Sequence, residues 1–126
     1  MTVYPKLYIE FVTLFNKQKF FEAHEALEIE WRRQSDRNDF YQGLIQLAAA
    51  FVHVQKHNFK GARNLILTAE KKLAPYFPDH QGIEVRKLCE EVKSSVNNAG
   101  SCAAGSVNVY YPIIALASTK KGDTRL

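Results

Sequence analysis

The chain has 126 residues, of which 46% are hydrophobic, and it carries a formal net charge of +4 with an isoelectric point near 9.1. This length and composition predict a single domain with a modest core. The excess positive charge is shared between residues 98–126 and the rest of the chain, and no basic stripe with interleaved aromatic residues occurs, so no nucleic-acid partner is expected.

The amino-terminal stretch, MTVYPKLYIEF, lacks the basic flank, apolar run and small-residue cleavage site of a secretory signal. No later segment reaches the roughly 18 to 20 consecutive apolar residues that a membrane span requires. We therefore expect a cytoplasmic protein without a membrane partner.

Apolar residues recur at helical spacing through most of the chain, and glycine and proline are sparse before Pro75. Asn38 or Asp39 is suited to cap one helix and Asn58 the next, whereas Pro75 and Pro78 end the fourth. Short connections predict that consecutive helices pack as antiparallel hairpins. The expected fold is all-α, a compact bundle of about five helices at residues 5–17, 19–33, 39–57, 59–74 and 83–96.

The character of the chain changes at residue 97. The stretch NNAGSCAAGS predicts a flexible linker, so we assign the helical domain to residues 1–97 and a linker with an apolar tail to residues 98–126. VNVYYPIIALAS, within that tail, leaves two interpretations open: an extended segment along the bundle, or a disordered tail with an apolar patch. Self-association through this tail, giving a homo-oligomer, is a further hypothesis. Cys89 and Cys102 form no CxxC pair and are expected to be free thiols.

The predicted helix 19–33 carries polar residues on its apolar face. At about 100° per residue, five side chains fall within roughly 60° of His24, namely Phe20, Phe21, Leu27, Glu28 and Trp31. His24 and Glu28 are therefore expected one turn apart on the buried side of this helix.

The predicted helix 39–57 is apolar nearly all round and is expected to lie centrally in the bundle. Its one polar stripe holds Gln42, Gln46 and His53, beside small residues that allow another helix to approach. If the two helices form a hairpin, the two polar stripes can face each other.

Three explanations of these stripes remain open. The polar groups can satisfy one another in a purely structural network. His24 and Glu28, at i and i+4, can instead bind a divalent metal ion with His53 as a third ligand, leaving an open position as in zinc or iron-type sites. Thirdly, His24 and Glu28 can act as a metal-free acid–base pair, although no serine or cysteine nucleophile is evident beside them.

Three stretches, FFEAHEALEIEW, FYQGLIQLAAAFVH and NFKGARNLILTAEKKL, together resemble a small all-helical family of bacteria, archaea and plants. That family is catalogued as domain of unknown function number three hundred and nine. His24, Glu28 and Trp31 match its His-x-x-x-Glu-x-x-Trp/Tyr motif, and a QGLIQ-type stretch with a later histidine follows. The resemblance covers residues 20–73 and implies an all-α fold and a motif suggested to bind metal, without an assigned activity.

Two hypotheses of function follow. The first is a divalent-metal or small-ligand site between the second and third helices, with His24, Glu28 and His53 as ligands. Trp31, Gln42 and Gln46 then support the ligands or contact the bound molecule. The alternative is a helical interaction module whose polar network is structural, suggested by the apolar third helix and by a Phe-x-x-Ala pattern repeated from Phe20 at Phe59. Whether the protein is an enzyme stays open.

Overall fold

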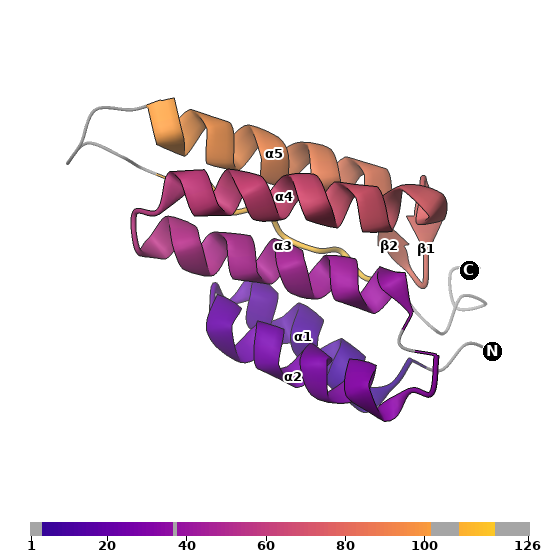
Figure 1. Cartoon of the computed structure of the whole chain (residues 1–126). Helices are drawn as coiled ribbons and strands as arrows, with labels where there is room; N and C mark the ends of the chain where they lie inside the picture. The colour runs from indigo at the N-terminus through magenta and orange to yellow at the C-terminus, as the bar shows by residue number, and fades with distance from the viewer. Residues whose placement is uncertain (1–3, 37, 102–108, 118–126) are drawn as a thin grey trace, which may run out of the picture.

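The computed structural model describes residues 4–36, 38–101 and 109–117 (Figure 1). As predicted, the fold is all-α, a bundle of helices whose chain neighbours pack together. A 3-10 turn, η1 (Ala74–Tyr76), and a two-stranded antiparallel hairpin precede the last helix. The remaining elements are α1 (Lys6–Asn16), α2 (Phe20–Arg33), α3 (Asp39–Gln55), α4 (Phe59–Leu73), β1 (Asp79–His80), β2 (Ile83–Glu84) and α5 (Val85–Ser101).

Helix α3 is the central element, as its apolar character predicts. Ten of its residues are buried, and it packs against both α2 and α4 (Figure 1). Phe51 on α3 meets Phe20 on α2 at a ring-centroid distance of 4.9 Å, and Phe20 in turn meets Phe15 of α1 at 5.1 Å. The aromatic rings therefore join the first three helices into one core.

The predicted caps are present at the starts of α3 and α4. The Oδ1 of Asn38 accepts a hydrogen bond from the backbone N–H of Tyr41, and the Oδ1 of Asn58 accepts one from Gly61. Each bond satisfies a backbone donor that the first turn of a helix leaves without an intrahelical partner. These caps explain why both helices begin where the sequence predicts.

The last helix is longer than the predicted 83–96, because α5 continues to Ser101, into the first residues assigned to the linker at 98–126. Val92, Val96 and Ala99 recur at helical spacing and are buried, so the apolar face of α5 extends beyond the point where the composition becomes small and polar. Cys89 on this helix is a buried free thiol, whereas Cys102 lies outside the described residues.

Residues 109–117, hereafter the C-terminal segment, run as an extended, non-helical stretch along the bundle (yellow in Figure 1). Ile114 is only 4% exposed. The ordered interpretation therefore holds for these nine residues, while the rest of the predicted tail, at 118–126, lies outside the described part. No helix within the described ranges combines the length and the apolar character that crossing a bilayer requires.

Candidate functional site

The polar stripes of α2 and α3 meet at one pocket. It has a volume of about 250 Å³, and its lining comes from α2, α3 and a single residue of α4. The lining residues are His24, Glu28, Trp31, Gln42, Ile45, Gln46, Ala49 and Leu65. The structure thus brings together five of the six side chains that the sequence singles out.

These residues are less buried than the helical pattern predicts. The buried side chains of α2 are Phe20, Ala23, Ala26 and Leu27, so its buried face is centred roughly 60 to 100° from His24. His24 lies at the edge of that face, and Phe21, expected inside, is 54% exposed. The polar residues therefore line an open pocket beside the core.

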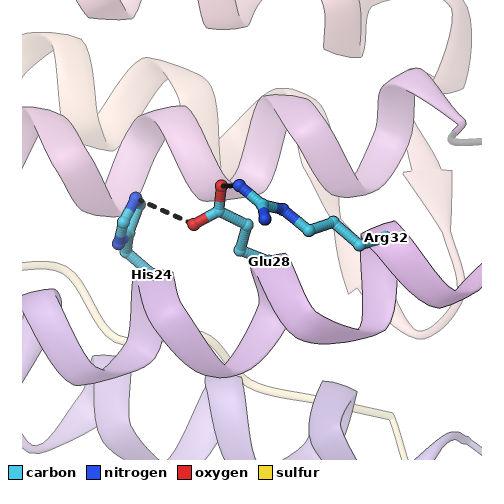
Figure 2. A network of polar contacts seen from close by, with 3 residues as sticks. All are labelled: His24, Glu28 and Arg32. Atoms are coloured by element: carbon cyan, nitrogen blue, oxygen red, sulfur yellow. Dashed lines mark hydrogen bonds and ion pairs between the residues drawn. The ribbon is translucent and has the colours of Figure 1, made fainter.

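Glu28 lies between two partners on its own helix (Figure 2). Its Oε1 is 3.7 Å from the Nε2 of His24, and its Oε2 accepts a hydrogen bond of 2.9 Å from the Nη2 of Arg32. The His24 and Glu28 side chains are 28% and 31% exposed, whereas Arg32 is 67% exposed. The carboxylate is consequently held in place from the solvent side while its other oxygen faces the imidazole.

Trp31 ties the pocket to the connection between α2 and α3. Its indole Nε1 donates to the backbone carbonyl of Asn38 at 3.1 Å. The same Asn38 donates from Nδ2 to the Oε1 of Gln34 at 2.6 Å and caps α3. The indole and the cap together fix how α2 approaches α3 at this end of the pocket.

Two polar atoms in the pocket residues lack a partner. The Nδ1 of His24 and the Oε1 of Gln46 are shielded from solvent and make no hydrogen bond within the described part of the chain. A buried polar atom without a partner costs about 1–3 kcal/mol, so most such atoms in proteins are paired. The predicted network, in which the polar residues satisfy one another, is therefore incomplete at these two atoms.

His53 is the predicted site residue that the structure does not bring to the pocket. It lies on the last turn of α3, where its Nδ1 is 3.1 Å from the Nδ2 of Asn58. Because the Oδ1 of Asn58 caps α4, its Nδ2 is the donor and His53 Nδ1 the acceptor. His53 shares a helix face with Gln46 but lies about 10 Å further along the axis.

For a metal ion, the pocket offers two protein ligands rather than three. Two ligand atoms of a tetrahedral zinc ion lie about 3.4 Å apart, close to the 3.7 Å between His24 Nε2 and Glu28 Oε1. Across the described residues, no group of three or more His, Cys, Asp or Glu side chains lies close enough together to hold a metal ion. The described residues therefore do not form the three-ligand site of His24, Glu28 and His53 that the sequence suggests.

The sequence interpretation missed some of the contacts and lining residues of the site. Arg32, which pairs with Glu28 without lining the pocket, stands four residues after it, a spacing that itself predicts an ion pair on a helix. Ala49 is one of the small residues that helical geometry places beside Gln46, whereas Ile45 lies about 100° from Gln46 and does not belong to that stripe. Leu65 belongs to α4, and no pattern within α4 indicates that it reaches the pocket.

Comparison with known proteins identifies the same region. The chain is 33% identical over 85 residues to the uncharacterized protein YpuF of Bacillus subtilis (strain 168), an alignment that covers 65% of this chain and 47% of that relative. The chain thus spans about half the length of this relative. Residues 8–65, which include every residue lining the pocket, match the family described as Domain of unknown function (DUF309).

Proposed function

We propose that the protein binds a small polar molecule in the pocket between α2 and α3. The observation that carries this proposal is the pair of unpartnered polar atoms, His24 Nδ1 and Gln46 Oε1, on residues that line the same pocket. The terminal torsions of histidine and glutamine side chains are soft, so either group can turn toward a ligand at small cost. Binding then supplies the hydrogen bonds that the chain itself does not.

The chemistry of the lining defines the class of ligand. Gln46 Oε1 is an acceptor, and His24 Nδ1 is an acceptor in the tautomer that carries its proton on Nε2. A matching ligand therefore carries hydrogen-bond donors, as amides, amines and polyols do. Ile45, Ala49 and Leu65 offer apolar contact to its carbon atoms. At about 250 Å³ the pocket is smaller than the ~300–1,000 Å³ typical of drug-sized ligands, which favours a metabolite-sized molecule.

A divalent cation is the second candidate, and the spacing of His24 and Glu28 favours it. Their ligand atoms need to approach by only a few tenths of an ångström to bind one ion. The hydrogen bond from Arg32 to Glu28 opposes this, because the guanidinium places a positive charge beside the carboxylate. We therefore rank the cation second.

Titration of the isotope-labelled chain, followed by amide NMR, tests both candidates. The probes are a set of small amides, amines and polyols, and separately zinc chloride and manganese chloride. We expect one class of organic probe to shift amide signals of α2 and α3 around the pocket, and Gln46→Leu to abolish these shifts.

The matched control is Gln55→Leu, which changes an exposed glutamine of α3 away from the pocket and leaves the shifts intact. Shifts caused by metal alone, and removed by both His24→Leu and Glu28→Gln, select the cation instead. If no probe perturbs pocket signals at millimolar concentration, the proposal fails.

A further inference from the structure

The C-terminal segment is held chiefly through its main chain. Asn16 of α1 donates from Nδ2 to the carbonyl of Ile114 at 2.9 Å and accepts from the Ile114 N–H on Oδ1 at 2.7 Å. This pair of bonds is the pattern that a neighbouring β-strand would offer one residue of an antiparallel partner. A single side chain on a helix thus takes the place of a strand.

Other parts of the bundle bind the main chain on either side of this point. The N–H of Ala117 donates to the carbonyl of Gly82 at 2.9 Å, and the hydroxyl of Tyr4 donates to the carbonyl of Ala117 at 3.1 Å. The hydroxyl of Ser95 on α5 donates to the carbonyl of Tyr110. These contacts depend on the backbone of the segment and are indifferent to its side chains.

From Pro112 to Ala115, side chains of the segment alternate between the bundle and solvent, whereas Tyr111 breaks this alternation and also packs inward. Pro112 and Ile114 are buried, whereas Ile113 and Ala115 are exposed. The Tyr111 ring lies 5.2 Å from the rings of both Phe20 and Phe51. A bundle that binds main-chain groups and accepts alternate side chains has the features of a groove for an extended peptide.

Packing on one side of the segment is incomplete. A cavity of about 110 Å³ lies between α5 and the segment, with Leu88 and Glu91 on one wall and Ile113 on the other. The segment is thus held at a few main-chain bonds and two side-chain anchors, Tyr111 and Ile114.

We propose that this groove is a peptide-binding site that recognises an extended main chain, and that its partner is the C-terminal segment of a second copy of the chain. The groove already fits that sequence, so an identical segment arriving from another molecule makes every contact described above. Exchange of an identical element between copies is a low-cost route to a dimer. In the closed monomer the tethered segment competes at a high effective concentration and keeps the groove filled.

The test uses the full chain with Ile114→Glu, which places a charge at the 4% exposed anchor and frees the groove without altering its walls. The probe is a fluorescein-labelled peptide, VYYPIIALA, with a lysine tag for solubility. We expect saturable binding to the Ile114→Glu chain. Affinity falls by at least about tenfold in Ile114→Glu/Asn16→Asp, because the new carboxylate cannot donate to the peptide carbonyl.

The matched control is Ile113→Glu, the same change at the neighbouring position, which is 63% exposed. This variant keeps its own segment in place, so the peptide does not bind. A mixture of Ile114→Glu and Asn16→Asp chains should also form a one-to-one dimer in sedimentation, because one supplies the free groove and the other the released segment. Peptide binding to Ile113→Glu equal to that of Ile114→Glu overturns the proposal, as does a mixture that stays monomeric.

If Ile114→Glu loses its helical circular dichroism, Ile114→Ala replaces it in the same assay. Unfolding of both variants means that the segment is an inseparable part of the core, and that result also overturns the proposal.

Discussion

His24 and Glu28 face each other across one helical turn with Nε2 and Oε1 3.7 Å apart, beyond hydrogen-bonding distance. The strong contact of Glu28 is instead with Arg32, at 2.9 Å on the solvent side. The pair is therefore positioned at the pocket without contributing a strong internal bond. Its structural role should be small, and the predictions below begin there.

Glu28→Gln is expected to change the free energy of unfolding by less than about 1 kcal/mol. Exposed i, i+4 ion pairs contribute only about 0.3–0.5 kcal/mol, and Arg32 is 67% exposed. Urea denaturation at low and at high salt measures this, and the small difference should shrink further in high salt. A loss of 2 kcal/mol or more, on a scale of about 1 kcal/mol for typical substitutions, would identify the carboxylate as a structural element.

Gly43→Ala is expected to destabilise the packing of α3 against α4. A Cβ at this position would lie 2.5 Å from the Cγ of Leu73, a buried side chain. Helix propensity alone favours alanine over glycine by about 1 kcal/mol, whereas overpacking a core costs about 1–3 kcal/mol. Thermal unfolding should show a net loss, and in a double-mutant cycle Gly43→Ala should cost less in a Leu73→Ala background, because that change removes the Cγ and both Cδ atoms. A Gly43→Ala protein that is more stable than the wild type contradicts the close contact.

Most of the fold follows from local signals in the sequence. The first four helices lie within two residues of their predicted bounds because apolar periodicity and the Asn38 and Asn58 caps act locally. The hairpin at 79–84 could not be predicted in the same way. It has two residues per strand, and a tertiary bond from the Tyr8 hydroxyl to the Gln81 carbonyl, at 2.7 Å, holds its turn.

The sequence indicates five side chains that line one pocket, but it also assigns His53 to the site, and His53 lies elsewhere. The angle of a residue around the helix axis indicates the side on which it lies, but not its position along that axis. His53 and Gln46 therefore fall on one predicted stripe although two turns separate them. The burial of His24 and Glu28 on α2 is overestimated from the sequence. The pattern shows which residues of a helix are apolar, but the neighbouring helix decides which of them face the core. For α2 the centre of the buried face lies nearer Ala23 than His24.

The free energy of unfolding should decrease as the pH falls below the ordinary pKa of histidine. The His80 ring is packed 4.6 Å from the Phe40 ring and 4.7 Å from the Tyr76 ring, and desolvation lowers its pKa. Between the lowered pKa of the folded state and the unfolded value near 6.5, the unfolded chain binds more protons, so acidification favours unfolding. His80→Gln should flatten this part of the urea-stability profile. An unchanged profile would show that His80 does not contribute to it.

Cys89 is expected to be inert in the folded protein. Burial raises the pKa of its thiol to about 12, so at pH 8 only about one molecule in ten thousand carries the reactive thiolate. In a Cys102→Ser background, a disulfide reagent should label Cys89 in urea at a rate equal to the rate of unfolding. Rapid labelling under native conditions would indicate that α5 opens locally.

The most direct measurement of the central claim is the free energy of unfolding of Gln46→Leu. If the polar stripe serves a ligand, Gln46 Oε1 is a cost to the free protein, and its replacement by an apolar side chain of similar size removes that cost. The account predicts a protein more stable than the wild type by about 1 kcal/mol that has lost ligand binding. If the stripe is a structural network, the same variant breaks a buried hydrogen bond, which typically costs about 1–3 kcal/mol. A loss of about 1 kcal/mol or more would therefore contradict the account.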